Sequence, residues 1–327
     1  MYVGGMRAWY AHGFGPPESL RFEESPDPPL ADGEVRIEVK AIGVNFPDVL
    51  LVGGTYQVKP TPPFIPGFEV AGSVLESRLP ELPVGTRVAA VLGMGGYATQ
   101  VVARRGSVWR MPDTMSFDDA AAMTLTYQTG WFALHRRAHL QSGETLLVHA
   151  GAGGVGSAAI QLGKAAGARV IATAGGADKV AVCRSLGADL AIDYKSEDFV
   201  AAVKATTSGR GADVIFDPVG GEILERSTKC IAFEGRIVVI GFTSGRAPEL
   251  RANHLLVKNY SLLGLHWGLY NQLDPAAVAQ AQAELYRLHG EGRIKPLVSE
   301  RLPLAEAPRA MTRVAARGTV GKLVLVP

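Results

Sequence analysis

A glycine-rich segment in the middle of the chain constrains the fold more than any other feature of the sequence. The apolar run Thr145–His149 is typical of a buried strand, and the pattern Gly-x-Gly-x-x-Gly follows it directly. A predicted helix, 155–166, and a second predicted strand, 169–173, come next. Since a strand, a glycine turn, a helix and a second strand form the context that this pattern requires, the sequence predicts a Rossmann domain.

Each glycine of the pattern has its own physical reason. Gly151 permits the tight turn from strand to helix, and Gly153 lets the backbone approach a pyrophosphate because it has no Cβ. Gly156 allows the helix and the strand to pack closely. Free backbone N–H groups at the start of a helix bind phosphate oxygens. The residues predicted to bind a dinucleotide here are Gly151, Ala152, Gly153, Gly154, Val155 and Gly156.

Strands and helices alternate through the rest of this half of the chain. The further predicted strands are 190–192, 213–216, 236–240 and 261–265. A helix is expected at 179–186, and another is expected to begin within 118–123, with Ser116 or Asp118 as its N-cap. Continuous apolar strands between helices predict a parallel sheet covered on both faces.

The first third of the chain is rich in predicted strands. Glu34–Ala41 alternates polar and apolar residues, as a half-buried strand does. Three further short strands are expected at Val70–Leu75, Arg87–Val91 and Ala98–Ala103. Short strands separated by glycines and prolines predict a small, irregular β-barrel. The tail, Arg293–Pro327, contains short strands such as Lys322–Val326 and is expected to rejoin this barrel.

The charge and cysteine content exclude several classes of protein. Lysine and arginine number 33 against 31 acidic residues, a net charge of +2, so we expect neither a nucleic-acid nor a membrane partner. Two cysteines, Cys183 and Cys230, are too few for a disulfide framework or a four-cysteine zinc site. Met1–Tyr10 lacks the apolar region of a secretory signal, and no run is long enough to span a membrane. We therefore expect a soluble, cytoplasmic protein.

The end of the second predicted strand favours NADPH as the cofactor. An NAD site usually has an acid there to hold the ribose 2′-hydroxyl group. This strand ends in Ala172-Thr173-Ala174-Gly175-Gly176, which contains no carboxylate. Asp178 is expected to support the N-terminus of the next helix. The two glycines leave room for a 2′-phosphate, and Lys179 can neutralise that phosphate.

Beyond these separate features, the whole chain resembles the quinone oxidoreductase (zeta-crystallin-like) branch of the medium-chain dehydrogenase/reductase superfamily. Five stretches carry the resemblance in the expected order: Gly43–Val49, Pro66–Gly72, Gly85–Val88, His149–Gly156 and Tyr260–Gly268. The resemblance implies an α/β fold in which a GroES-like catalytic barrel is split around the Rossmann domain. The barrel would comprise residues 1–122 and 268–327, and the Rossmann domain residues 123–267.

Compared with the zinc-dependent members of the superfamily, this chain lacks the metal ligands. Those members carry a cysteine where this chain has Val44-Asn45, and Gly-His-Glu where it has Gly67-Phe68-Glu69. Phenylalanine cannot bind a metal, and no cysteine precedes Cys183, so we expect no metal site. Glu69 is expected to form a structural ion pair inside the barrel.

The resemblance also implies roles for individual residues. It places Asn45, Phe46 and Thr129 at the nicotinamide end, although several relatives have tyrosine at the position of Phe46. It implies that the carboxamide lies against Ile240, Gly241, Phe242 and Thr243. Around the 2′-phosphate it places Gly175, Lys179 and Tyr194, with Arg317 as a further basic candidate. Thr173 is a further predicted cofactor-binding residue. The residues implied to line the cleft between the domains are Leu265, His266 and Trp267. Tyr56 matches a tyrosine on the substrate side.

Without a metal, the reaction must depend on the hydride of the cofactor and on a water-poor cleft. A quinone or an enone accepts hydride readily because the negative charge delocalises on to conjugated oxygen. Either Asn45 or the hydroxyl group of Tyr56 is expected to hydrogen-bond the developing anion. The leading hypothesis is an NADPH-dependent quinone oxidoreductase, and the main alternative is an enone or enoyl-thioester reductase. A third hypothesis is a non-catalytic NADPH-binding protein with a structural or RNA-binding role.

The strand at 261–265 also predicts an oligomer. It is apolar and last in the Rossmann order, so it is expected to form an exposed edge of the sheet. Such an edge invites pairing with its own copy across a two-fold axis. We therefore expect a homodimer through this strand.

Overall fold

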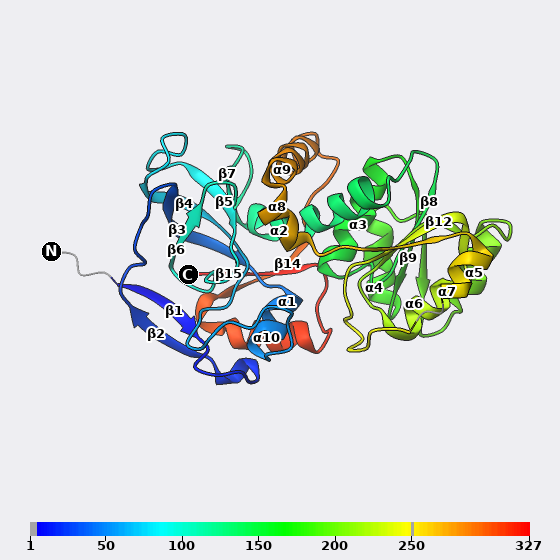
Figure 1. The fold of residues 1–327 in the computed structure, drawn as a ribbon, viewed down its shortest axis with the longest axis horizontal. Coiled ribbons are helices and arrows are strands. Elements are labelled where there is room, and N and C mark those ends of the chain that lie inside the picture. Colours follow the sequence, from blue (N-terminus) through cyan, green and yellow to red (C-terminus); the bar gives the residue numbers. More distant parts are fainter. Residues whose placement is uncertain (1–4, 250–251) are drawn as a thin grey trace. The chain divides into compact units, whose positions relative to one another are not determined.

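The computed structural model describes residues 5–249 and 252–327. The described chain forms two compact units (Figure 1). The barrel unit comprises Met1–Leu125, Asn271–Tyr286 and Pro296–Pro327, and the Rossmann unit comprises Thr126–Tyr270 and Arg287–Lys295. The domain boundaries after residues 122 and 267 stay a prediction, because compact units are defined by contacts and not by independent folding. The first four residues, where no secretory signal is expected, lie outside the described part.

The barrel unit is built around a seven-stranded sheet of order β14-β15-β3-β4-β5-β7, in which β6 also pairs with β3. Its strands are β3 (Glu34–Gly43), β4 (Glu69–Ser77), β5 (Arg87–Val91), β6 (Gln100–Arg104), β7 (Val108–Arg110), β14 (Val298–Pro303) and β15 (Lys322–Val326). A two-stranded sheet of β1 (Met6–Tyr10) and β2 (Arg21–Ser25) accompanies it. The tail does rejoin the barrel as predicted, since Val324 of β15 pairs with Gly43 of β3.

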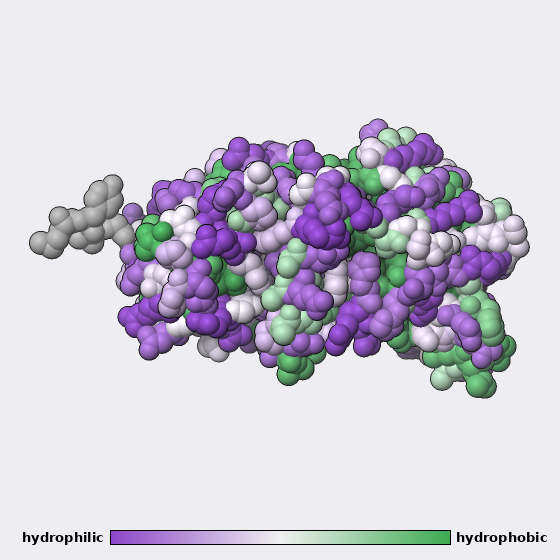
Figure 2. Space-filling model, turned by 90° about the horizontal axis from the view of Figure 1, so that it is seen from above, coloured by the Kyte–Doolittle hydropathy of each residue, from purple (hydrophilic) through white to green (hydrophobic). Residues whose placement is uncertain are grey.

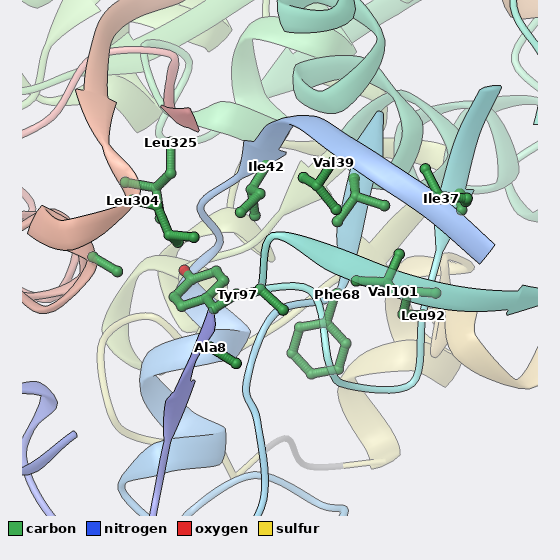
Figure 3. Packing of buried hydrophobic residues seen from close by; sticks show 14 of the residues in the cluster. Ala8, Ile37, Val39, Ile42, Phe68, Leu92, Tyr97, Val101, Leu304 and Leu325 are labelled. Carbon is green, nitrogen blue, oxygen red and sulfur yellow. The ribbon is translucent and has the colours of Figure 1, made fainter. Parts of the chain in front are cut away.

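Alternating residues of β3 explain how the barrel buries its core. Val35, Ile37 and Val39 are buried, and the polar residues between them are more exposed, as the sequence pattern predicts. Figure 3 shows Ile37 and Val39 packed with residues of other elements, including Phe68 and Tyr97. A core that draws on so many segments fixes the positions of the loops that join them.

The barrel unit also contains short helices and helical turns. Those within the barrel unit are η1 (Pro17–Ser19), α1 (Phe46–Val52), η3 (Leu304–Glu306) and α10 (Ala307–Ala315). Three helices extend from one unit into the next: α2 (Phe117–Trp131), α8 (Trp267–Leu273) and α9 (Pro275–Gly290). The N-cap of α2 is Ser116, whose Oγ accepts a hydrogen bond of 3.0 Å from the N–H of Asp119. The alternative cap, Asp118, is wrong: it lies inside the helix and pairs with Arg301 at 2.8 Å.

The Rossmann unit contains a parallel six-stranded sheet of order β10-β9-β8-β11-β12-β13. The strands are β8 (Thr145–Val148), β9 (Arg169–Ala174), β10 (Leu190–Asp193), β11 (Ala212–Asp217), β12 (Ile231–Val239) and β13 (Ser261–Gly264). The helical segments are η2 (Phe132–Arg137, π-helical), α3 (Gly154–Ala165), α4 (Ala177–Ser185), α5 (Phe199–Thr206), α6 (Gly221–Ser227) and α7 (Ala252–Lys258). The predicted fold class is confirmed, and the sheet places β13 at its edge as predicted.

One strand differs from its predicted bounds for a physical reason. The strand predicted at 236–240 begins at Ile231, because Ile231 pairs with Ala212 before a register shift in the ladder. Glu234 lies in the left-handed region within this strand, with φ of 56°. A polar bulge of this kind interrupts the apolar run from which the strand was predicted.

None of the helices formed by the described residues combines the length and the apolar character that crossing a membrane requires.

Candidate cofactor and active site

The glycine loop between β8 and α3 is shaped by lack of space more than by unusual backbone angles. Its left-handed residue is Ala150, with φ of 51°, and not one of the three glycines of the motif. A Cβ on Gly156 would collide with the carbonyl group of Ala150, which explains the need for glycine there. At Gly151 a Cβ would lie 2.9 Å from Sγ of Cys183 and 3.0 Å from Cβ of Ala172. Gly151 lies in the turn between β8 and α3, and its lack of a Cβ also lets the loop pack on its neighbours.

By contrast, Gly153 is less crowded than Gly151 and Gly156. The nearest atom to a Cβ built on this residue is the carbonyl oxygen of Ala150, at 3.3 Å. Gly153 is the N-cap of α3, and the helix begins at Gly154. The first N–H groups of a helix have no partner within the helix. A glycine at the N-cap, followed by such N–H groups, fits a bound pyrophosphate.

His149 anchors the start of this loop. Its Nδ1 lies 3.0 Å from Oγ1 of Thr173 on β9, and its Nε2 lies 2.8 Å from Oγ of Ser227 on α6. Burial lowers the pKa of His149 to about 3, so the ring is neutral at working pH. A neutral ring has one donor and one acceptor, and each hydroxyl group can supply the complementary role. The hydroxyl group of Thr173, a predicted cofactor residue, is thus engaged by His149.

The turn after β9 brings together two of the residues predicted to surround a 2′-phosphate. A Cβ on Gly175 would lie 2.5 Å from Oη of Tyr194 and 3.3 Å from Cε of Lys195. The nearby carboxylate of Asp193 accepts hydrogen bonds from the N–H groups of Gly176 (2.9 Å) and Lys195 (3.0 Å), which lower its pKa. Asp193 is therefore directed to the backbone of this turn.

Two further residues were predicted to surround the 2′-phosphate. Lys179 lies in the first turn of α4, and Arg317 follows α10 in the barrel unit. Lys195 was missed by the sequence analysis. The signal that could have found it is a second lysine directly after Tyr194.

The segments after β12 and β13 hold the residues predicted near the carboxamide and the cleft. The N–H group of Ile240 donates to the carbonyl of Asp217 at 2.9 Å, and that of Leu265 donates to the carbonyl of Val239 at 3.1 Å. Both residues thus follow the carboxyl ends of parallel strands, where α/β sheets bind their ligands.

The remaining members of this set surround those two residues. Gly241, Phe242 and Thr243 follow Ile240, and the N–H group of Thr243 donates to the carbonyl of Pro218 at 3.1 Å. Phe242 is 45% exposed, whereas Trp267, after His266, is buried at the start of α8. Thr129 lies in the part of α2 that belongs to the Rossmann unit.

In the barrel unit, a buried network surrounds Asn45. The ammonium group of Lys322, from β15, donates to Oδ1 of Asn45 (2.6 Å), to Oε1 of Glu69 (2.7 Å) and to the carbonyl of Val44 (2.9 Å). Nδ2 of Asn45 donates to Oε1 of Glu69 at 2.9 Å and to the carbonyl of Gly43 at 3.1 Å. The ion pair predicted for Glu69 is confirmed, with Lys322 as its partner.

A second buried acid, Asp48, adjoins this network. Its Oδ2 accepts hydrogen bonds from the N–H group of Asn45 (2.7 Å) and from the hydroxyl group of Tyr97 (3.0 Å). Its Oδ1 has no partner among the described residues. Burial raises the pKa of Asp48 to about 7, against the hydrogen bonds and the charge of Lys322, which lower it.

Tyr56, the predicted substrate-side residue, is half-buried, and its ring lies 5.6 Å from that of Phe68. Burial and the charge of Asp48 raise the pKa of its hydroxyl group. The hydroxyl group therefore keeps its proton at working pH and remains a hydrogen-bond donor. The adjoining Phe46 begins α1.

The position of the missing metal ligand is occupied by apolar packing. Phe68 is 8% exposed and lies in the core of the barrel unit, as Figure 3 shows. Among the described residues, no three histidine, cysteine, aspartate or glutamate side chains are grouped so as to hold a metal ion. Sequence reasoning missed Lys322, Asp48 and Tyr97, because no local motif marks them.

Comparisons with known proteins agree with this geometry. Residues 31–113 match the family described as alcohol dehydrogenase GroES-like domain, and residues 154–283 match that described as zinc-binding dehydrogenase. A quinone oxidoreductase-like protein 2 homolog from Nematostella vectensis is 38% identical over 301 residues, which cover 90% of this chain and 82% of that protein. The chain belongs to the quinone oxidoreductase branch of the medium-chain dehydrogenase/reductases.

Solved structures of two kinds of reductase are similar to this chain over its whole length. The Escherichia coli quinone oxidoreductase, solved as a complex with NADPH, has a TM-score of 0.92 and 32% identity, covering 98% of this chain and all of that one. The CurK enoyl reductase has a TM-score of 0.90 and 28% identity, covering 99% of both chains. The medium-chain fold therefore carries both kinds of reductase among the structures that this chain resembles.

Proposed function

We propose that this chain is an NADPH-dependent oxidoreductase that transfers hydride to a quinone or a related conjugated carbonyl without a metal. The observation that carries the proposal is the filled metal position: Phe68 is packed in the barrel core, and the Lys322 ammonium group bonds to Val44, Asn45 and Glu69. A buried ammonium group and a bivalent cation cannot share these acceptors. The catalytic power must then come from the cofactor and from positioning.

The proposed chemistry is a two-electron reduction. NADPH, when bound, supplies a hydride. The substrate gains that hydride and a proton, so that a quinone becomes a hydroquinone and the cofactor becomes NADP⁺. We assign the donor for the developing oxyanion to the Tyr56 hydroxyl group, whose raised pKa keeps it protonated. Both N–H bonds of the Asn45 carboxamide already have acceptors inside the barrel, which favours Tyr56 over Asn45 for this role.

The experiment that tests this proposal is a kinetic comparison on one purified preparation. We expect NADPH oxidation with 1,4-benzoquinone as acceptor, unchanged after exhaustive chelation and dialysis. Tyr56→Phe should lower kcat by on the order of 10²-fold, since it removes one donor to the oxyanion. Loss of activity on chelation, or full activity in Tyr56→Phe, would contradict the proposal.

The similarity to an enoyl reductase favours a second candidate, reduction of an enone or an enoyl thioester by the same hydride. The developing charge then lies on the oxygen of an enolate, and Tyr56 has the same task. Side-by-side kcat/KM values for a quinone and for 2-alkenals distinguish the two candidates. A ratio above about 100 for either substrate class, or about 2.7 kcal/mol in transition-state binding, would decide between them.

The preference for NADPH has its own support. β9 ends without a carboxylate, and the absence of a Cβ on Gly175 lets the hydroxyl group of Tyr194 lie against the turn after β9. A charge-assisted bond from Lys179 to a 2′-phosphate contributes about 1.5–3 kcal/mol. Lys179→Ala should therefore raise the KM for NADPH by roughly 10- to 100-fold and leave that for NADH nearly unchanged. Lys204→Ala, on α5 of the same unit, is the control and should change neither value. Equal use of both cofactors by the wild type would show that this assignment is wrong.

We also propose a homodimer formed through β13. This strand lies at the edge of the sheet, and Leu262 on it is 37% exposed. Figure 2 shows exposed hydrophobic residues gathered on part of the surface, and those of the Rossmann unit include Phe233, Leu256 and Val257. Sedimentation at micromolar concentration should show a dimer. Leu262→Lys should dissociate it by placing like charges across the two-fold axis. A wild-type monomer would contradict the proposal.

A further inference from the structure

Lys322 is a cation enclosed by the barrel and fully satisfied there. Its side chain is 4% exposed, and that of its partner Glu69 is fully buried. The ammonium group has three N–H bonds and three acceptors, at 2.6, 2.7 and 2.9 Å. Residue 322 lies on the last strand of the chain, 277 positions after Asn45. This contact therefore exists only when β15 is in place beside β3.

This arrangement fixes which way the Asn45 carboxamide points. An ammonium group can only donate, so the amide oxygen must face Lys322. The amide nitrogen then faces two acceptors, Oε1 of Glu69 and the carbonyl of Gly43. In the flipped amide, an NH₂ group would face the ammonium group, and a lone pair would face the carboxylate. One orientation is favoured by both ends of the amide at once.

The same contacts lie where the zinc-dependent members of the superfamily carry their metal ligands. The Lys322 ammonium group bonds to both Val44 and Asn45, at the position of the cysteine ligand. It also bonds to Glu69, which follows the position of the histidine ligand. A cation supplied by the chain itself thus bridges these positions.

We propose that Lys322 is a positioning residue: as an internal cation it locks the Asn45 carboxamide and so sets the nicotinamide end of the site. The inference rests on the proposed function, because Asn45 is placed at that end by resemblance. With both N–H bonds engaged, the carboxamide of Asn45 has no donor left for a developing oxyanion. The oxyanion is therefore left to Tyr56.

A neutral double variant separates this role from simple charge balance. Lys322→Met alone leaves the Glu69 carboxylate buried and unpaired, which destabilises the fold. Lys322→Met/Glu69→Gln removes both charges, and a buried ion pair can often be replaced in this way without loss of stability. The glutamine amide introduced at position 69 can donate to Asn45 Oδ1, so the lock on the carboxamide is lost. The matched control is Lys164→Met/Asp189→Asn, which removes an ion pair of 2.8 Å in the Rossmann unit.

We expect the double variant to unfold within a few degrees of the wild type and to bind NADPH with a Kd within about twofold. Its kcat should fall at least tenfold, and the primary isotope effect with deuterated NADPH should rise, because hydride transfer has become slower. The control pair should leave kcat unchanged. A folded double variant with kcat within twofold of the wild type would overturn the inference, since Lys322 would then only balance Glu69.

A measurement on the wild type keeps the test valid even where the double variant does not fold. In protein labelled with ¹⁵N-asparagine, the side-chain NH₂ of Asn45 should exchange with solvent far more slowly than that of Asn253, because both its N–H bonds are held inside the barrel. Exchange at the rate of an exposed asparagine would contradict the lock. This exchange measurement needs no turnover, so it tests the inference separately from the proposed function. Failure of the proposed function would instead appear as a wild type that is inactive on every quinone.

Discussion

The glycine loop of the Rossmann unit and the polar network of the barrel unit solve the same problem in different ways. Each must hold hydrogen-bonding groups in place away from water. The loop does so with the backbone of one short segment, Ala150–Gly156, in which glycines leave out the Cβ atoms that would collide with neighbouring groups. The network does so with side chains from distant segments, including Asn45, Glu69 and Lys322. Local backbone chemistry suits a site that every dinucleotide shares, whereas long-range side-chain contacts tune one particular site.

The two regions also differ in how they bury a titratable group. His149 can be neutral with both ring nitrogens bonded, at 3.0 and 2.8 Å. Asp48 becomes neutral only by taking up a proton, and its Oδ1 has no partner among the described residues. Burial therefore costs less at His149, because the neutral form satisfies every partner. The opposite pKa shifts of the two groups make the comparison testable.

The largest effect should come from breaking the loop. Gly156→Ala places a Cβ against the Ala150 carbonyl group, so we expect a large loss of thermal stability and no measurable NADPH binding. Gly153→Ala is the milder comparison, because the nearest atom to its Cβ, the carbonyl oxygen of Ala150 at 3.3 Å, needs to move only a little. It should melt much closer to the wild type than Gly156→Ala does and bind NADPH weakly, since the methyl group blocks the pyrophosphate. Thermal unfolding and a fluorescence titration measure both, and a stable, cofactor-binding Gly156→Ala would contradict the steric account.

A smaller effect is expected from His149→Gln, measured as unfolding free energy against pH. The pKa of His149 falls from 6.5 to about 3 on folding, because burial penalises the charged ring. The unfolded chain therefore binds more protons between these values, and the wild type loses stability as pH falls from about 6.5 towards 3. Relative to the glutamine variant, the slope should approach about 1.4 kcal/mol per pH unit. Parallel curves for the two proteins would mean that His149 is charged or exposed.

The smallest expected effect, over a slightly narrower pH range, has the opposite sign. Folding raises the pKa of Asp48 from 3.8 to about 7, chiefly through burial, against the influence of Asn45, Tyr97 and Lys322 and with that of Glu69. The stability linked to the protonated form is present below pH 3.8 and is lost as pH rises towards 7. Asp48→Asn cannot ionise, so the wild type should lose stability relative to it by up to about 1.4 kcal/mol per pH unit in this range. A wild type that gains stability with pH against this variant would show that Asp48 is ionised when folded.

The glycine loop could be predicted from the sequence better than the barrel network, because the loop depends on local contacts and the network on contacts between distant segments. The strand–glycine–helix order and the parallel sheet were predicted closely, because apolar periodicity and glycine placement are local properties. Ser116 and Asp118 were both plausible N-caps of α2 in the sequence. In the structure, the Ser116 hydroxyl group accepts the hydrogen bond from the N–H group of Asp119, so Ser116 is the cap. The ion pair of Glu69 was predicted without its partner. Lys322 carries no local signal, since a lysine at the start of a strand is ordinarily exposed to solvent.

The sequence by itself determined that β8, the glycine loop and α3 form a nucleotide-binding motif, because each requirement is met within about a dozen residues. It also determined that Phe68 cannot bind a metal. Only the tertiary structure decided which groups surround Asn45, since that depends on β15 pairing with β3 at Val324 and Gly43. Contacts across 277 positions depend on the register of the whole sheet, and a register one residue away would turn Lys322 to the opposite face.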